Sequence, residues 1–276
     1  MKSGRFERQS FLGAQSEEIL RATRVAIVGL GGGGSQITQQ LAHIGVGYPC
    51  ILDPQMIEDS NLNRLVGGTQ ADVDNATPKV EIAGRLIRAI NPTIKVVELL
   101  DRWQQRPEVV QGCDFIFGCL DSFGERNQLE RLARRFLIPY IDIGMDVHLV
   151  GDSFSVSGQV ALSLPEFPCL WCMGLLTERR LAEEARRYGA AGGKPQVIWP
   201  NGMLASSAVG LFMNMLFPWQ GKFDPPLLLE YDGNRHTMVE SNKLPTLRRM
   251  KCRHHSGSLG DPFWGGSIVA AAAAAI

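Results

Sequence analysis

Residues 26–47 read AIVGLGGGGSQITQQLAHIGVG, in which an apolar run passes through a cluster of glycines into a stretch with helical character. Gly29, Gly31 and Gly34 have the spacing G-x-G-x-x-G. This spacing allows a tight turn, lets the backbone approach a phosphate closely, and packs the following helix against a sheet with its N–H groups facing an anion. The pattern therefore predicts a strand, a phosphate-binding turn and a helix, with a turn that binds nothing as the alternative.

The composition of the 276-residue chain is typical of a globular protein. Hydrophobic residues make up 45% of it, and 28 basic and 28 acidic residues give a formal net charge of 0. This balance offers no basic surface for nucleic acid, and neither a signal peptide nor an apolar run of about 18 residues occurs. We expect a cytoplasmic protein that binds neither nucleic acid nor membrane, with its six cysteines as thiols or metal ligands rather than disulfides.

Apolar runs of strand length alternate with helical patterns through the first half of the chain. The expected strands are VAIVG from residue 25, YPCILD from 48, IKVVELL from 94, CDFIFGCLD from 113 and PYIDIG from 139. Such alternation indicates right-handed crossovers and a parallel sheet covered on both faces. After about residue 145, VHLVGDSFSVSGQVALSLP alternates in the manner of antiparallel strands. We predict an α/β fold with a doubly wound, mainly parallel, Rossmann-like sheet extended by antiparallel strands.

The segment after the second expected strand distinguishes between kinds of nucleotide site. Asp53 ends YPCILD, near the place where a dinucleotide-binding fold has the acid that binds ribose hydroxyls. A dehydrogenase would continue quickly into its next helix, whereas here a polar loop follows that carries Asn61, Asn63 and Arg64. The loop therefore argues against an NAD-dependent oxidoreductase.

The next helix begins with a misplaced cation. Thr77 and Pro78 predict an N-cap and a first helical position, which puts Lys79 in the first turn. A cation there opposes the helix dipole unless an anion lies between them. Lys79, Arg64 and the glycine turn thus converge at the carboxyl ends of the strands, where open α/β sheets bind ligands. For each cation taken separately, a solvated surface position is the alternative.

The motifs VAIVGLGGGGS, LDPQMIEDSNLNR, TPKVE…AINP and FGCLDSFGERNQL, in this order, resemble the ThiF/MoeB/HesA superfamily, which includes the catalytic domains of ubiquitin-activating enzymes. The resemblance covers roughly residues 5 to 255. It implies an ATP-dependent adenylyltransferase, acting as a homodimer or pseudo-dimer. Its substrate is typically the C-terminal carboxylate of a ubiquitin-like or sulfur-carrier protein.

The resemblance also implies roles for individual residues. ATP would be bound by the glycine turn, the ribose-binding acid, the SNLxR segment and the helix-start lysine: Gly29, Gly31, Gly32, Gly34, Asp53, Asn61, Arg64 and Lys79. Arg64 and Lys79 would also act in catalysis, and Asp121 would hold Mg²⁺. Arg8 matches an arginine that family members reach into the partner's active site. Fixed cations and a metal offset the charge that gathers on phosphorus oxygens, so no side-chain nucleophile is needed.

The chain departs from the family pattern in a few places. Gln55 stands where a second aspartate is frequent, and Leu65 stands where glutamine is common. The glycine run is richer than usual, so Gly32 and Gly33 are expected to loosen the turn. Near the proposed site, Asp142 and Asp146 flank the end of a strand. They either bind a metal or shape the path of the incoming carboxyl tail, or belong to a salt bridge or loop cap.

Two cysteine-containing segments predict a structural zinc site. Cys169 and Cys172 have C-x-x-C spacing, and Cys252 is followed by two histidines. One C-x-x-C pair and a distant second pair can hold one tetrahedral Zn²⁺, as in many members of the resembled family. The spacing predicts His255 as the fourth ligand, with His254 as the alternative, and a redox-active C-x-x-C pair is the other interpretation. Zinc there would clamp the C-terminal part onto the domain.

No cysteine is found where the resembled ubiquitin-activating enzymes often place the one that receives the activated tail. That segment precedes the last large helix and reads AGGKPQVIWPNGM, residues 191–203. The acyl-adenylate would then pass directly to a thiol or amine of another protein, or to sulfide. Two alternatives remain open, namely adenylation of a small peptide or amino acid, and a non-catalytic pseudo-dimer scaffold.

We treat the chain as one adenylation domain over residues 1–276. It comprises an N-terminal arm (1–22), a nucleotide-binding half (23–145), a substrate and dimer half with the zinc site (146–255), and a tail (256–276).

Overall fold

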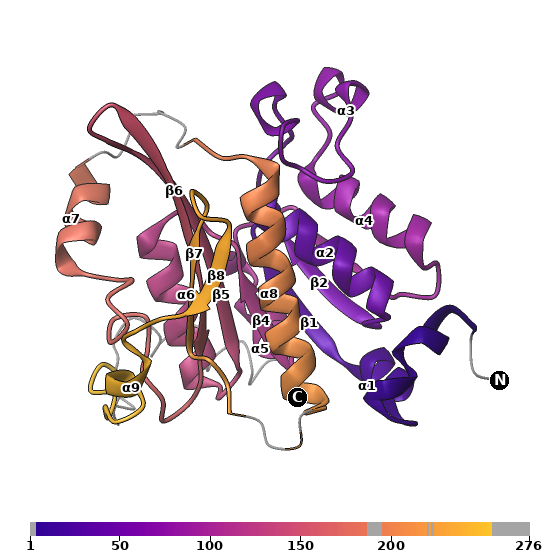
Figure 1. Cartoon of the computed structure of the whole chain (residues 1–276). Coiled ribbons are helices and arrows are strands. Elements are labelled where there is room, and N and C mark those ends of the chain that lie inside the picture. The colour runs from indigo at the N-terminus through magenta and orange to yellow at the C-terminus, as the bar shows by residue number, and fades with distance from the viewer. Residues whose placement is uncertain (1–3, 187–194, 220, 222–223, 256–276) are drawn as a thin grey trace.

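The computed structural model describes residues 4–186, 195–219, 221 and 224–255 (Figure 1). Its centre is an eight-stranded sheet in the order β3-β2-β1-β4-β5-β6-β7-β8. The strands are β1 (Arg24–Val28), β2 (Tyr48–Leu52), β3 (Val97–Leu99), β4 (Phe115–Gly118), β5 (Tyr140–Val150), β6 (Ser153–Ser163), β7 (Leu228–Asp232) and β8 (Thr237–Glu240). Pairing is parallel from β3 to β5 and antiparallel from β5 to β8. The predicted fold class is confirmed.

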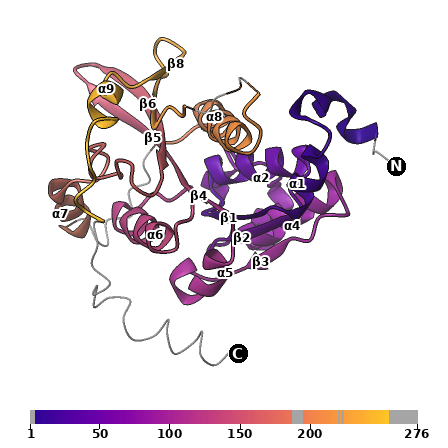
Figure 2. The ribbon, with the colours of Figure 1, turned by 90° about the horizontal axis from the view of Figure 1, so that it is seen from below.

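Helices cover both faces of the sheet, as Figure 2 shows from below. They are α1 (Ser16–Ala22), α2 (Gly32–Ile44), α3 (Gln70–Asp74), α4 (Lys79–Ile90), α5 (Pro107–Gln111), α6 (Phe123–Arg135), α7 (Glu178–Arg186), α8 (Ile198–Leu216) and α9 (Leu244–Leu247), with 3-10 turns η1 (Gly4–Leu12), η2 (Asp59–Asn61) and η3 (Trp103–Gln105). Buried side chains of α2, α4 and α8 pack on one face, and those of α5, α6 and α9 on the other. None of the helices in this described part is long and apolar enough to cross a membrane.

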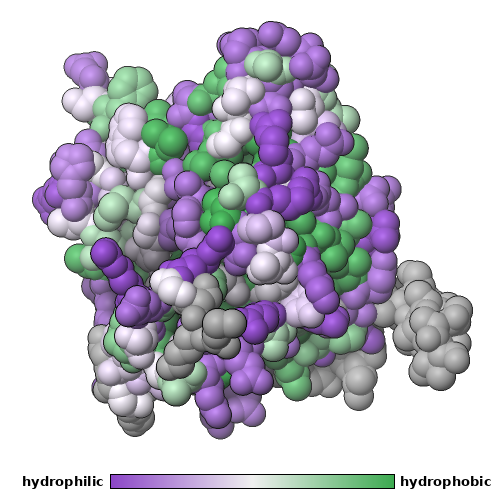
Figure 3. All heavy atoms as spheres, turned by 90° about the vertical axis from the view of Figure 1, so that its right-hand side faces the viewer, coloured by the Kyte–Doolittle hydropathy of each residue, from purple (hydrophilic) through white to green (hydrophobic). Residues whose placement is uncertain are grey.

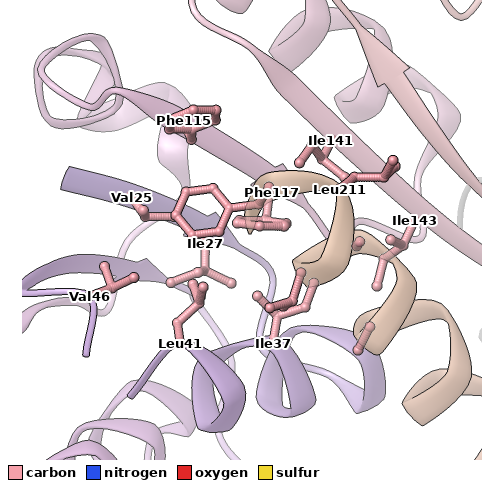
Figure 4. Packing of buried hydrophobic residues seen from close by; sticks show 14 of the residues in the cluster. Val25, Ile27, Ile37, Leu41, Val46, Phe115, Phe117, Ile141, Ile143 and Leu211 are labelled. Carbon is pink, nitrogen blue, oxygen red and sulfur yellow. The ribbon is translucent and has the colours of Figure 1, made fainter. Parts of the chain in front are cut away.

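The core explains why β1 is apolar at almost every position. Val25 and Ile27 belong to the cluster on the side of α2 and α8, where Phe117 and Leu211 pack nearby (Figure 4). Ala26, between them, belongs to the cluster on the opposite face. A parallel strand covered on both faces cannot alternate apolar and polar residues. Each fully buried aliphatic side chain there contributes about 1.5–3 kcal/mol to folding.

The second half of the sheet is built on one long hairpin. β5 and β6 pair over their whole length around Gly151, which has a φ of 59°. The boundary that we expect between the two halves of the domain, at residues 145 and 146, falls inside β5, so this strand belongs to both halves.

The side of the molecule seen in Figure 3 is hydrophilic over much of its top, where α3 projects, with hydrophobic patches below.

Several predicted elements shift in their bounds. β3 and β4 are shorter at both ends than the apolar runs that predict them: β3 comprises only Val97–Leu99 and β4 only Phe115–Gly118. α4 begins at Lys79 with Pro78 as its N-cap, one residue later than predicted, because Pro78 has an extended ψ of 137°. The tail at 256–276 lies outside the described residues, as do 187–194.

The turn between β1 and α2 supplies a stability test. A Cβ at Gly34 would overlap the carbonyl oxygen of Gly29. We therefore expect Gly34→Ala to lower the free energy of unfolding by about 1–3 kcal/mol, the usual cost of overpacking. Gly210, inside α8, has no atom within 4 Å of the position of a Cβ. As a control, Gly210→Ala should raise stability by about 0.5–1 kcal/mol through helix propensity. Chemical denaturation measures both, and a Gly34→Ala variant as stable as the wild type would contradict this packing.

Candidate functional site

Three neighbouring strands end together at the proposed site. Val28 at the end of β1 is paired with Leu52 of β2 and with Gly118 of β4. The Gly29 N–H donates to the carbonyl of Leu52 at 2.9 Å, and the Cys119 N–H donates to that of Val28 at 2.8 Å. The glycine turn, Asp53 and the chain leading to Asp121 therefore leave the sheet side by side at its carboxyl edge.

Glycine is required at different positions of the turn for different physical reasons. Gly29 has a φ of 91°, and a Cβ there would meet the Cys119 carbonyl. Gly31, the N-cap of α2, is half-buried, and the position of a Cβ there lies in open space, with none of the surrounding atoms within 4 Å. Room for a ligand at the start of a 13-residue helix is what a phosphate-binding turn requires.

Gly32 and Gly33 serve packing rather than looseness, contrary to the expectation from the sequence. Both lie in the first turn of α2. A Cβ at Gly32 would come within 2.6 Å of Asn201 Nδ2 and 3.3 Å of Arg64 Cβ, and a Cβ at Gly33 would overlap the side chain of Ile143. The extra glycines let α8 and β5 approach the start of α2.

Asp53 holds the glycine turn in place through a hydrogen bond to its backbone. Its side chain is 5% exposed. Oδ2 accepts a hydrogen bond from the Leu30 N–H at 2.7 Å, and Oδ1 accepts one from the Gln55 N–H at 2.9 Å. Hydrogen bonds to an ionised carboxylate are about twice as strong as neutral ones. Asp53 thus presents a fixed anionic acceptor next to the turn.

Lys79 is a buried cation with a neutral partner. It is 6% exposed and lies at the start of α4. Nζ donates to Gln55 Oε1 at 2.6 Å, and among the described residues no carboxylate forms an ion pair with it. Burial and the helix dipole both disfavour a positive charge here, and a neutral amide offsets that cost only in part. A bound anion would remove the penalty.

The SNLNR segment places a second cation beside the turn. Asn61 is buried, and its Oδ1 accepts from the Glu58 N–H at 3.2 Å, which closes η2. Arg64 Nη1 donates to the Ser60 carbonyl at 2.6 Å and to Asn63 Oδ1 at 2.9 Å. Both partners of the guanidinium are neutral, so its charge is available to a ligand.

Asp121 is exposed just after β4, in the chain that leads into α6. Beside it, Glu184 from α7 accepts from the N–H groups of Phe123 and Gly124 at 2.9 and 2.8 Å. A carboxylate at a helix N-terminus is favoured by the dipole. The contact of Glu184 with the start of α6 could not be predicted from the sequence, because the position of an acid within a charged helix does not indicate which other helix it contacts.

Asp142 and Asp146 do not form a common site. Asp142 is fully buried, bonded twice to the buried guanidinium of Arg126, and accepts from the Tyr140 hydroxyl at 2.8 Å. Asp146 is exposed, and its Oδ2 lies 3.3 Å from His148 Nδ1. The salt-bridge alternative for Asp142 is therefore the one that the structure shows.

Arg8 lies far from the glycine turn of its own chain. It is exposed in η1, which packs at the opposite end of α2. There the ring of Phe6 covers Gly45, and Gln9 Nε2 donates to the Ile44 carbonyl at 3.4 Å. The 13 residues of α2 span about 20 Å, so Arg8 and the glycine turn are at opposite ends of this helix.

The cysteine segments come together in a separate cluster. The ligand atoms of Cys169, Cys172, Cys252 and His254 all lie within 4.8 Å of one another. His254 Nδ1 is 3.4 Å from each of the sulfurs of Cys169 and Cys172. Burial raises the pKa of the Cys169 thiol, and the nearby Glu130 carboxylate raises it further. A bound cation would restore the thiolate, and three sulfurs with one imidazole suit Zn²⁺.

The histidine that lies beside the three sulfurs is His254, which the spacing gave as the alternative to His255. His255 Nε2 points to Glu130, 3.7 Å from its Oε2, and forms a second group with Glu130 and Cys169. His254 stacks on the ring of Trp171 and takes the place beside the sulfurs. Spacing alone could not separate the two, because it does not tell which histidine a buried carboxylate attracts.

The chain belongs to the ThiF family, whose model matches residues 6–254. It is similar to a SAMP-activating enzyme E1 of Haloferax volcanii, with 32% identity over 59% of this chain and 57% of that protein. It is also similar to a molybdopterin-synthase adenylyltransferase of Salmonella typhimurium, with 30% identity over 79% of this chain and 85% of the relative. The crystal structure of E. coli MccB with ATP shares its fold, with a TM-score of 0.70 and 18% identity over 87% of this chain and 72% of that one.

We propose that Cys169, Cys172, Cys252 and His254 hold one structural Zn²⁺, and metal analysis tests this. The wild type should contain about one zinc per chain. His254→Ala should lose the metal and melt at a lower temperature, because a structural zinc contributes directly to folding. His255→Ala, the neighbouring control, should retain it. Retention in His254→Ala with loss in His255→Ala would reverse the assignment, and a folded wild type without metal would exclude the site.

Proposed function

We propose that this protein uses ATP to adenylate the C-terminal carboxylate of a ubiquitin-like or sulfur-carrier protein, forming an acyl-adenylate and pyrophosphate. The observation that carries the proposal is the buried ammonium of Lys79, whose partner is the neutral Gln55. Gln55 is bonded in turn to Asp53, which also holds the glycine turn at Leu30. The printed names of the relatives, a SAMP-activating enzyme and an adenylyltransferase, support it.

The described geometry suggests how the nucleotide would be held. Asp53 would bind the ribose hydroxyls, as an acid at the end of the second strand does in related nucleotide sites. The N–H groups at the start of α2 and the amide of Asn61 would face the phosphates. Gly31 leaves room for this approach, and Gly29, Gly32 and Gly34 let the turn and the start of α2 pack without a Cβ.

The reaction requires charge stabilisation rather than a protein nucleophile. An oxygen of the ionised carboxylate bonds to the α-phosphorus, and the bond from that phosphorus to the bridging oxygen breaks as pyrophosphate leaves. Arg64 and Lys79 would offset the negative charge on the phosphate oxygens without reorganising. The exposed carboxylate of Asp121 fits Mg²⁺, which prefers oxygen ligands and supplies further positive charge when bound.

Arg8 would act only across a dimer. Because it lies at the far end of α2 from the glycine turn of its own chain, a catalytic role requires a second copy that places its Arg8 at this site. We therefore propose a homodimer with shared active sites.

The activated carboxylate would pass directly to an external acceptor. Cys119 lies next to the glycine turn, but burial raises the pKa of its thiol and Asp142 raises it further. A thiol held in its protonated form is a poor nucleophile. Residues 191–203 contain no cysteine, and part of that stretch, 191–194, lies outside the described residues.

Exchange of labelled pyrophosphate into ATP tests the function, with ubiquitin-like proteins that end in Gly-Gly as substrates. We expect exchange in the wild type and a loss of at least about 100-fold in Lys79→Ala and in Asp121→Ala, the effect of removing one preorganised charge. Lys95→Ala is the matched control, because the Lys95 ammonium is exposed above the ring of Tyr48.

Different failures have different meanings. Unchanged exchange in Asp121→Ala would refute the magnesium assignment. Exchange with short peptides but with no ubiquitin-like protein would favour the peptide-adenylating alternative. No exchange with either would contradict the proposed reaction.

A further inference from the structure

The segment just before α8, residues 195–197, is bonded by one asparagine of the SNLNR loop and by another within α8. Asn63 Nδ2 donates to the Gln196 carbonyl at 3.0 Å. From within α8, Asn201 Nδ2 donates to the Val197 carbonyl at 2.8 Å. Two successive carbonyls of this pre-α8 segment are thus held by asparagines, one of which comes from the SNLNR loop.

Asn63 has a second partner that makes it a bridge. Its Oδ1 accepts from Arg64 Nη1 at 2.9 Å while its Nδ2 holds Gln196. A carboxamide donates from one atom and accepts at another, whereas an ionised carboxylate only accepts and a hydroxyl donates and accepts at the same oxygen. One side chain therefore connects the cation proposed to bind phosphate with the pre-α8 segment.

The packing beneath this bridge is tight. Asn201 is 5% exposed, and its Nδ2 is 2.6 Å from the position of a Cβ on Gly32. Arg64 Cβ is 3.3 Å from the same position. Arg64, the start of α2 and the start of α8 therefore meet at one glycine, and close-packed elements of this kind transmit small displacements.

We propose that Asn63 is a positioning residue that couples the nucleotide to the pre-α8 segment. ATP that draws in the Arg64 guanidinium orders the pre-α8 segment through Asn63, and by linkage an ordered segment strengthens ATP binding. The inference rests on the proposed function for the identity of the nucleotide.

Hydrogen exchange of the intact protein with and without Mg-ATP tests the coupling. In the wild type, ATP should slow exchange both in residues 29–44 and in residues 195–203. In Asn63→Ala, residues 29–44 should still be protected, since Arg64 keeps its bond to Ser60, but the effect on 195–203 should fall at least about fivefold, the lower range of measured site-to-site coupling.

Two further variants separate coupling from a general loss of structure. Asn63→Gln keeps the amide and should restore part of the ATP effect on residues 195–203. Asn75→Ala removes another exposed asparagine whose Nδ2 donates to a backbone carbonyl, that of Ala71 at 2.7 Å, and should behave as the wild type.

The outcomes distinguish this inference from the proposed function. Protection of residues 29–44 without any change at 195–203 in the wild type would overturn the coupling and leave the function standing. The same result follows if Asn63→Ala keeps the full ATP effect at 195–203. Protection of neither region by ATP would overturn both.

Discussion

A buried ammonium without a negative partner is the constraint on which the site depends. Lys79 is enclosed at the start of α4, where the helix dipole opposes it, and Gln55 supplies only a neutral acceptor. In a protein of ordinary stability such a charge is a cost that packing elsewhere must offset. Arg64 is likewise bonded to neutral oxygens alone. We propose that a polyphosphate bound at the N-terminus of α2 neutralises both cations.

The same region shows how the fold holds this site in place. Asp53 pins Leu30 and Gln55, so one carboxylate fixes both the glycine turn and the residue that holds Lys79. Gly32 admits Asn201, which brings the start of α8 against the start of α2. Residues 23–145 therefore pack directly against α8, and β5 runs from this first part of the chain into the second part, which contains α8.

Much of this architecture could be predicted from the sequence. The alternation of apolar runs with helical patterns, then the switch to period-two alternation after residue 145, correctly predicts the parallel sheet and its antiparallel extension. The motif order places Gly29, Asp53, Arg64 and Lys79 around one sheet edge, where the structure has them. Arg8 lies outside this group. The sequence could not predict its position relative to the site, because a motif does not say whether a residue acts in its own chain or in a partner.

Other features depended on long-range contacts that local patterns do not encode. The pairing of Asp142 with Arg126, the binding of Glu184 at the start of α6, and the choice of His254 over His255 each follow from which side chains tertiary packing brings together. α4 begins one residue later than predicted, because the ψ of Pro78 is extended rather than helical. The need for glycine at positions 32 and 33 could not be predicted, because it arises from the packing of Asn201 and Ile143 against them.

The central claim is that Lys79 and Arg64 surround the phosphates of ATP, and a crystal structure of the protein with Mg-ATP tests it most directly. We expect the triphosphate to lie over the backbone of Gly31, with the Lys79 ammonium turned from Gln55 toward a phosphate oxygen. A nucleotide bound at another place, with Lys79 still donating to Gln55, would contradict it.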